Sequence, residues 1–365
     1  PWREEPTPYR VWVSEIMLQQ TRVEAVKPYY ERFLKALPDA AALAACPEDQ
    51  LMKLWEGLGY YNRVRNMQKA AITVTEEYGG VLPADYGKLL ELKGIGSYTA
   101  GAIASIAYGI PVPAVDGNVL RILTRVAADD TDIMKQSFRS AVEAQLGSMM
   151  RDLTVPEGLR RALRDENVPG ALNQAMMELG ATVCVPNGAP LCEECPWNKM
   201  CLARAQGRMM DFPVKSKAKA RRIEERTVLV IRDGEKVAIR KRPKKGLLAG
   251  LYELPNLSGA LSAKEVLSYM KEQQFAPLRI EKLADAKHIF SHIEWRMSGY
   301  AILVEEAGFA AEGEPEAGNG RTPEEKADGE GGLIFVDAWD ARERYAIPSA
   351  FSAYAGYLKK EFDEE

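Results

Sequence analysis

The sequence predicts a multidomain protein of the class α plus α+β, in which a helical domain precedes a domain built around a sheet. Residues 1–202 show helical spacing of apolar side chains, interrupted by short glycine and proline turns. Residues 227–365 instead contain short runs rich in β-branched side chains. Between them, 203–226 carries eight basic and three acidic residues without a sustained apolar period. We expect a basic linker there.

Length and composition allow two or three domains with cores of their own, because the chain has 365 residues and is 46% hydrophobic. No run of eighteen or more apolar residues occurs, so we expect no membrane span, and no secretory signal is present. A cytoplasmic protein with access to nucleoid DNA is expected. The chain starts at Pro1 without an initiator methionine, so we expect further residues before it.

Charge is distributed unevenly along the chain. Residues 305–330 contain nine acidic and two basic side chains, and without them the net charge changes from −4 to +3. We expect a disordered insertion over 310–330, which is rich in glycine, proline and acids. The remaining body has enough positive charge to present a basic face to phosphates.

Helical elements are expected throughout the first domain. Tyr9 to Gln20 has the spacing of a buried helix, and Thr21-Arg22-Val23-Glu24 has the pattern of a capping box that opens the next one. Further helices are predicted over 49–55, 64–78, 85–91, 97–108, 117–127, 134–146 and 170–181.

Strands are expected in the second domain. Thr227–Ile231 and Lys236–Arg240 flank Asp233-Gly234, a dipeptide typical of a hairpin turn. Residues 289–304 and 333–336 also have strand character.

A two-glycine turn between helices lies at Leu92 to Ala100, within a helix–hairpin–helix that we place at about 86–108. Gly94 and Gly96 permit positive φ and leave the backbone uncovered. The helix that follows directs free N–H groups outward, which suits a phosphate and would grip it regardless of sequence. Taken alone, the pattern is more often that of an ordinary helix–helix turn.

Four of the five cysteines lie within eighteen residues, with the spacing Cys184-x7-Cys192-x2-Cys195-x5-Cys201. Such density in a reducing compartment indicates a metal centre rather than disulfides. Four thiolates suit zinc or a [4Fe–4S] cluster, and the spacing alone does not separate the two. Cys46 stands apart in an alanine-rich stretch and is expected to be buried.

Several motifs together resemble the MutY family of adenine DNA glycosylases, within the helix–hairpin–helix superfamily that includes endonuclease III. They are Val11–Thr21, Trp55–Arg63 and Ala114–Val119, with the hairpin and the cysteines. The resemblance implies a helical glycosylase domain with an iron–sulfur loop at 184–201, followed by a Nudix-like (MutT-like) α/β domain. It also implies base excision repair by a monomer, which hydrolytically removes adenine opposite 8-oxoguanine or guanine from double-stranded DNA after flipping the base out.

The cysteine spacing departs slightly from the family. The usual pattern is C-x6-C-x2-C-x5-C, and this chain has one extra residue in the first gap, Val185 to Leu191. A longer loop can absorb that residue without moving the thiolates. The resemblance therefore implies a [4Fe–4S] cluster held by Cys184, Cys192, Cys195 and Cys201.

The chemistry requires two carboxyl groups, one to protonate the departing base and one to stabilise an oxocarbenium-like sugar. The resemblance assigns the first role to Glu15, which protonates N7 of adenine and assists water, and the second to Asp116. Glu15 lies among apolar residues, so burial should raise its pKa. Asp116 precedes a helix and can also be its N-cap. The resemblance adds Asn118 and Tyr98 to the catalytic site.

Tyr98 distinguishes two branches of the superfamily. The endonuclease III family has a lysine there that attacks C1′ through a Schiff base and cuts the strand. A tyrosine cannot form a Schiff base. We therefore expect a monofunctional enzyme without efficient lyase activity.

By the same resemblance, Gln20 and Tyr60 enter the duplex near 8-oxoguanine while adenine is flipped out. Phe290, Ser291 and His292 form a loop that reads 8-oxoguanine. Further DNA contacts are expected from Arg3, Leu18, Thr21, Gly94 and Gly96.

Three other functions compete with this one. An endonuclease III-like glycosylase/lyase is disfavoured by Tyr98, and a non-enzymatic iron–sulfur DNA-binding protein by the presence of both Glu15 and Asp116. A Nudix hydrolase is disfavoured because Gly250–Pro255 resembles part of a Nudix domain but residues 264–272 lack the carboxylates that hold magnesium.

Overall fold

The computed structural model describes residues 1–153, 167–216, 220–305 and 332–358. The chain forms two compact units, Pro1–Cys46 with Asn62–Ala218 and Pro47–Tyr61 with Lys219–Glu365. The predicted insertion at 310–330 lies outside the described residues. In the described part, no helix is long and apolar enough to span a membrane.

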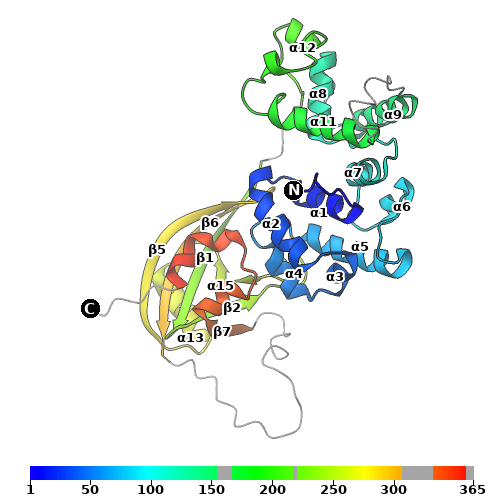
Figure 1. Cartoon of the computed structure of the whole chain (residues 1–365). Coiled ribbons are helices and arrows are strands. Elements are labelled where there is room, and N and C mark those ends of the chain that lie inside the picture. The colour runs from blue at the N-terminus through cyan, green and yellow to red at the C-terminus, as the bar shows by residue number, and fades with distance from the viewer. Residues whose placement is uncertain (154–166, 217–219, 306–331, 359–365) are drawn as a thin grey trace. The chain divides into compact units, whose positions relative to one another are not determined.

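The first unit is helical (Figure 1). Asp39, Asp85 and Asp116 cap three of its helices with side-chain oxygens, and Thr7 caps the first, with Pro8 at its start. Its elements are α1 (Pro8–Leu18), α2 (Val23–Ala36), α3 (Ala40–Ala45), α5 (Asn62–Tyr78), α6 (Tyr86–Glu91), α7 (Ser97–Tyr108), α8 (Gly117–Ala127), α9 (Gln136–Asp152), α11 (Val168–Thr182), the 3-10 turn η1 (Cys192–Glu194) and α12 (Leu202–Ala205).

Helices α1 and α7 form the centre of this unit. Both are buried over most of their length, α1 from Val11 to Met17 and α7 from Thr99 to Ile106, as expected of helices that are apolar all round. At Gly101 of α7, an added Cβ would lie 2.1 Å from the carbonyl oxygen of Pro113. The segment that leads to Asp116 therefore runs directly against α7, and this close approach positions that residue.

The predicted capping box after α1 is wrong. Helix α2 begins at Val23 with Arg22 as its N-cap, and no side chain caps it. The chain turns through Gln20 in the left-handed region, with φ of 63°. The helix therefore starts one residue later than Thr21 and Glu24 would require. The other predicted helices are present with ends shifted by a few residues, most of all α9, which continues to Asp152.

The second unit contains a mixed sheet with the order β3-β2-β1-β6-β5, in which β4 also pairs with β1 and β7 with β2. Strand β1 runs parallel to β6, and the other pairs are antiparallel. The strands are β1 (Arg222–Asp233), β2 (Lys236–Lys241), β3 (Tyr252–Glu253), β4 (Asn256–Ser258), β5 (Pro277–Ile289), β6 (Ile293–Val304) and β7 (Leu333–Asp337), and the unit also holds α4 (Glu48–Trp55). The predicted fold class, α plus α+β, is confirmed.

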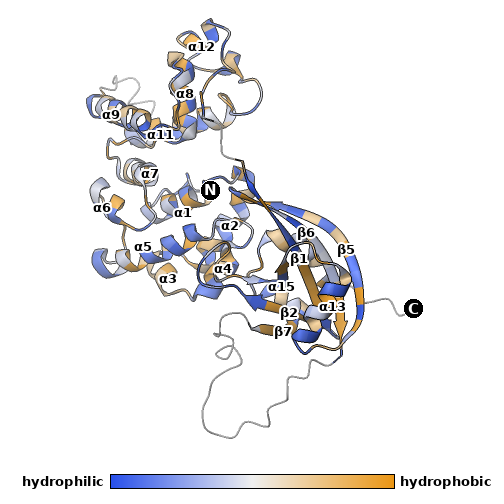
Figure 2. Ribbon diagram, turned by 180° about the vertical axis from the view of Figure 1, so that it is seen from behind, coloured by the Kyte–Doolittle hydropathy of each residue, from blue (hydrophilic) through white to orange (hydrophobic). Residues whose placement is uncertain are grey.

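Alternating side chains of β1 build two apolar layers. Val228 and Val230 pack with α15 (Ala338–Glu343) and the 3-10 helix η2 (Ser349–Leu358) on one face of the sheet. Leu229 and Ile231 pack with α13 (Ala263–Glu272) on the other. Figure 2 shows apolar colouring on the central strands, whereas β5 alternates between polar and apolar residues, as suits an edge strand with one exposed face.

The predicted hairpin is confirmed, but two strands differ from the sequence expectation. The hairpin lies at Asp233-Gly234, with Asp233 opposite Lys236. However, β1 begins at Arg222, within the stretch predicted to be a linker, because Arg222–Arg226 pairs in parallel with β6 from Ile293 onward. The predicted strand over 289–304 corresponds to β6, and its partner β5 was not foreseen.

Substitution of Gly101 by alanine should lower the free energy of unfolding by about 1–3 kcal/mol, because the new methyl group would overlap the Pro113 carbonyl. Urea unfolding measures this change. Gly117→Ala is the matched control, since a Cβ on Gly117 meets nothing within 4 Å. An unchanged midpoint for Gly101→Ala would contradict the close approach of α7 to residue 113.

Candidate active site

Glu15 is a buried carboxyl group on α1, with 6% of its surface exposed. Its pKa is raised to about 7, mainly by burial and to a smaller extent by charge repulsion from Asp116. The hydrogen bond from Tyr98 and the charge of Arg3 act in the opposite direction. The expected rise in the pKa of Glu15 is confirmed. A carboxyl group with this pKa holds a proton for a large part of the time near neutral pH.

Tyr98 is the hydrogen-bond partner of Glu15. It is the second residue of α7, and its hydroxyl donates to Oε2 of Glu15 at 2.6 Å. Burial, followed by the charges of Glu15 and Asp116, raises the pKa of Tyr98 well above its ordinary value. The phenol therefore stays protonated and can act only through hydrogen bonds at this position.

Asp116 is the N-cap of α8. Its Oδ1 accepts from the backbone N–H groups of Asn118 at 2.8 Å and Val119 at 2.9 Å. Its Oδ2 accepts from Nδ2 of Asn118 at 2.7 Å. Three donors therefore fix the carboxylate in one orientation at the positive end of a helix. The structure brings Asp116 and Glu15 close enough for their charges to interact.

Arg121 connects this carboxylate to the cysteine loop, and sequence reasoning missed it. Its Nη2 donates to Oδ1 of Asn118 at 2.9 Å and to the Gly180 carbonyl at 2.8 Å. Its Nε donates to the carbonyl of Cys184 at 2.8 Å. The available signal was a charged residue three positions after Asn118 in an apolar helix, where it lies on the same face.

The four clustered cysteines line one pocket of about 410 Å³, part of it open to solvent, together with Arg125 and Trp197. Burial and the charges of the other three thiols raise the pKa of Cys192, which indicates that the four sulfurs are neighbours. Among the described residues, no three His, Cys, Asp or Glu side chains converge as they would on a single metal ion. Four thiol groups around one pocket are a donor set that suits zinc or a [4Fe–4S] cluster.

Arg125 of α8 holds this loop. Its Nη1 lies 3.3 Å from Sγ of Cys184 and donates to the Val185 carbonyl at 3.0 Å. The thiol of Cys201 donates to the carbonyl of Arg125 at 3.4 Å. Helix α8 thus carries Asp116 at its start and contacts the cysteine loop through two of its arginines.

The predicted hairpin is formed by α6, a turn at Leu92–Gly96, and α7. Gly94 has φ of 81°, and a Cβ there would lie 2.7 Å from Cβ of Asn66, so both conformation and space require glycine. Gly96 differs from expectation, because its φ of −96° is ordinary and it serves as the N-cap of α7.

Gln20 and Tyr60 both have left-handed backbones, with φ of 63° and 47°. This conformation costs a residue with a side chain roughly 1–2 kcal/mol. Arg63 holds the end of α1 just before Gln20 by donating to the carbonyls of Ile16 and Gln19 at 2.6 Å each. Arg63 is a second residue that sequence reasoning missed.

The remaining predicted DNA contacts lie near α1 and its flanks. Leu18 is the last residue of α1, and Thr21 follows the Gln20 turn. Arg3 forms an exposed ion pair with Glu178 at 2.8 Å. These placements leave their roles as predictions.

The predicted reading loop joins β5 to β6. The ring of Phe290 points inward, 4.6 Å from the ring of His288 and 5.0 Å from that of Trp295. Ser291 and His292 are exposed, and Oγ of Ser291 lies 3.1 Å from Nδ1 of His292. Phe290 therefore anchors the loop, and the two polar residues form its tip.

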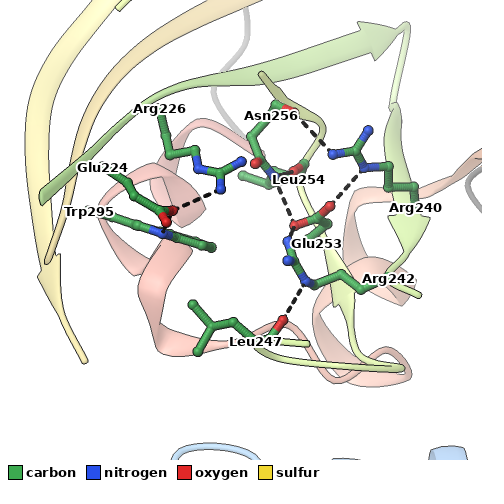
Figure 3. Close-up of polar contacts among 9 residues, drawn as sticks. All are labelled: Glu224, Arg226, Arg240, Arg242, Leu247, Glu253, Leu254, Asn256 and Trp295. Atoms are coloured by element: carbon green, nitrogen blue, oxygen red, sulfur yellow. Dashed lines mark hydrogen bonds and ion pairs between the residues drawn. The ribbon is translucent and has the colours of Figure 1, made fainter. Parts of the chain in front are cut away.

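In the Nudix-like motif Gly250–Pro255, two arginines pair with the carboxylate of Glu253 (Figure 3). The carboxylate of Glu253 is buried and pairs with Arg240, at 2.7 Å, and with Arg242. Asn256 donates to it at 2.8 Å. On α13, the carboxylate of Glu265 is bound to the N–H and hydroxyl of Ser262 in a capping box. Both carboxylates are therefore already engaged within the protein.

Fold and site together define a helix–hairpin–helix repair protein. Residues 13–146 match the HhH-GPD superfamily of base excision DNA repair proteins, and residues 227–355 match the NUDIX domain family. The chain is 34% identical over 364 residues to an adenine DNA glycosylase of Rattus norvegicus, covering 84% of this chain and 67% of that one. It is 31% identical over 292 residues to the adenine DNA glycosylase of Buchnera aphidicola subsp. Acyrthosiphon pisum, covering 80% and 78%. The chain belongs to the adenine DNA glycosylase family.

The coverage of its relatives is partial. The chain spans between 61% and 67% of the length of the rat, human and mouse relatives. Among solved structures, it resembles a thermostable thymine-DNA glycosylase with 26% identity and a TM-score of 0.47, covering 56% of this chain and 88% of that one.

The raised pKa of Glu15 predicts a pH-dependent stability. The pKa of Glu15 is about 7 in the folded protein, against an ordinary value of 4.5. Protonation therefore favours the folded state, and the stability from this group is complete below pH 4.5 and lost as the pH rises to about 7. Relative to Glu15→Gln, the wild type should lose up to about 1.4 kcal/mol per pH unit across that range.

Urea unfolding of both proteins at several pH values measures the difference between their free energies of unfolding. The contributions of the other titrating groups cancel in this difference. A difference that stays constant across the range would show that burial does not raise the pKa of Glu15.

Proposed function

We propose that the chain removes adenine paired with 8-oxoguanine or guanine from double-stranded DNA, by hydrolysis of the N-glycosidic bond after the base is flipped out. The observation that carries this proposal is the buried Glu15, whose pKa of about 7 suits a general acid at neutral pH. Membership of the adenine DNA glycosylase family supports the choice of base.

Glu15 performs the proton transfers in this proposal. In its protonated form it donates to N7 of adenine, the bond between C1′ and N9 breaks, and the electron pair leaves with neutral adenine. The carboxylate that remains accepts a proton from the water that attacks C1′. The cycle ends with Glu15 protonated again and an abasic sugar in the DNA.

Asp116 stabilises the sugar while it carries positive charge. Its three hydrogen bonds with residues 118 and 119 hold the carboxylate in a fixed orientation before the reaction. A charge that is oriented in advance does not need to reorganise when the cation develops.

Tyr98 supports hydrolysis without strand cleavage. Its phenol cannot form a Schiff base with C1′, and its hydrogen bond to Glu15 at 2.6 Å keeps the general acid in place. We therefore propose a monofunctional glycosylase.

Cys184, Cys192, Cys195 and Cys201 would hold a [4Fe–4S] cluster in the pocket that they line. The cluster would supply the cross-link that keeps the 184–201 loop folded. Arg121 and Arg125 contact the first cysteine of this loop from α8.

We propose that the base opposite adenine is recognised by the loop with Ser291 and His292 and by the two residues Gln20 and Tyr60. Adenine is a normal base, so the enzyme must read its partner. Ser291 and His292 would offer hydrogen bonds to 8-oxoguanine, with Phe290 as their anchor. Gln20 and Tyr60 would occupy the opened stack.

Substitution of either carboxyl group should slow base release while leaving DNA binding intact. Glu15→Gln removes the proton donor and should lower the single-turnover rate by about 10²–10⁴-fold. Asp116→Asn keeps the shape of the cap but removes the charge. This variant should still bind DNA but should release adenine very slowly. The measurement is adenine release from duplexes that carry adenine opposite 8-oxoguanine, guanine or cytosine.

Wild-type protein provides two controls in the same assay. It should prefer 8-oxoguanine and guanine over cytosine opposite adenine, and it should leave the abasic strand uncut until alkali is added. Near-normal release by Glu15→Gln would overturn the assignment of the general acid. Strand cleavage trapped by borohydride at the rate of base loss would favour an endonuclease III-like enzyme.

Purified protein should be yellow-brown and contain about four iron atoms per chain, as expected for a [4Fe–4S] cluster. Cys192→Ser should fold poorly or bind DNA weakly, because the shape of the loop depends on the centre. Metal analysis and visible absorption test this, with Cys46→Ser as the control. Stoichiometric zinc without iron in anaerobically prepared protein would contradict the cluster.

A further inference from the structure

The segment that carries Tyr60 belongs to the unit of the C-terminal sheet. Residues Pro47–Tyr61 lie in sequence between helices of the first unit, yet they group with Lys219–Glu365. At the first turn of α4, both carboxylate oxygens of Asp49 accept from Nζ of Lys241, at 2.9 and 3.0 Å. Lys241 comes from β2, so the start of α4 is tied to the sheet.

The last turn of α4 is tied more closely. Nζ of Lys53 donates to the carbonyls of Arg342 and Tyr345, the latter at 3.2 Å. Oε1 of Glu56 accepts from the N–H of Ile347 at 2.9 Å. Lys53 and Glu56 also pair with each other at 2.6 Å, and both side chains are mostly buried. We call Lys53 and Glu56 the α4 clamp.

The segment that the α4 clamp contacts, residues 342–347, is itself attached to the sheet. The N–H of Tyr252 donates to the Ala346 carbonyl at 3.2 Å, and the ring of Tyr252 lies 4.6 Å from that of Tyr345. Ile347 packs against the apolar core of this face. The clamp therefore joins α4 to a rigid part of the C-terminal unit rather than to a loose loop.

Only three residues, Gly57 to Gly59, lie between Glu56 and Tyr60, and their backbone has little conformational freedom. Trp55 is fully buried, and its Nε1 donates to the Gly59 carbonyl at 3.0 Å. Leu58 is buried as well. Gly57, Gly59 and Tyr60 have φ of 95°, 69° and 47°. A non-glycine residue keeps such a conformation only where its surroundings determine it.

We propose that Lys53 and Glu56 are positioning residues through which the C-terminal domain sets the turn that presents Tyr60, and that they thereby determine preference for the base opposite adenine. The inference rests on the proposed function, in which Tyr60 enters the duplex. It assigns the C-terminal domain a second part in recognition, separate from Ser291 and His292. Neither clamp residue needs to touch DNA in this role.

Lys53→Met removes the donor to two carbonyls and should lower the preference for 8-oxoguanine over guanine opposite adenine. The ratio of the single-turnover rates on the two duplexes should fall about tenfold, within the range expected for coupled neighbours. Release from the guanine duplex should stay within about twofold of wild type, since Glu15 and Asp116 are untouched. Glu56→Gln keeps an acceptor for Ile347 and should show a smaller change of the same sign, and Lys53→Arg should restore most of the preference.

Matched controls come from α2, where Lys27 and Glu24 form an ion pair of the same spacing at 2.6 Å. Lys27→Met and Glu24→Gln should leave the ratio unchanged. The decisive readout is a double-mutant cycle with Tyr60→Ala. If the clamp acts through Tyr60, Lys53→Met should change the ratio little once Tyr60 is alanine.

Additive effects of the two substitutions would overturn the inference, as would equal losses on both duplexes, because these indicate a separate or general structural role. Full preference in folded Lys53→Met, or in Glu56→Gln should the former not fold, would also overturn it. These outcomes differ from failure of the proposed function, in which wild-type protein releases adenine from neither duplex.

Discussion

Burial of one carboxyl group governs the architecture of the catalytic unit. An ionised carboxylate inside an apolar helix pair is costly, and the cost falls when the group holds a proton. Glu15 is surrounded by the apolar residues of α1, and one strong hydrogen bond from Tyr98 satisfies it. Burial of Glu15 is the main cause of its raised pKa, and the close approach at Gly101 joins α7 to the segment before Asp116. Stability and acidity therefore depend on the same packing.

Helix α8 gives the second carboxylate a different environment. Asp116 accepts three hydrogen bonds at the helix start, whereas Arg121 and Arg125 reach the cysteine loop further along the same helix. The two carboxyl groups thus differ because buried Glu15 accepts one hydrogen bond from Tyr98, whereas Asp116 accepts three. This difference suits one group to carry a proton and the other to carry charge.

Local patterns in the sequence predicted much of this arrangement, and non-local contacts account for most of what they missed. Helix periods, the Asp116 cap and burial of Glu15 could be predicted from nearby residues in the sequence. The start of β1 depends on pairing with β6, 71 residues away, and its charged residues do not have the apolar pattern of a strand. Arg121 and Lys53 donate to carbonyls that are far away in sequence and become neighbours only in the fold. The ring of Phe290 lies against that of Trp295, a contact that the sequence does not reveal.

The parallel pairing of β1 with β6 has a consequence for how the C-terminal region can be divided. The N–H of Arg222 donates to the carbonyl of His292 at 3.0 Å, so the first residue of the strand supports the tip of the loop that we propose to read 8-oxoguanine. A fragment that starts at Thr227, where the apolar pattern begins, would lack this support and leave the edge of β6 from Ile293 to Met297 without its parallel neighbour. Such an exposed edge invites association with other chains. The functional border of the domain therefore lies upstream of its hydrophobic border.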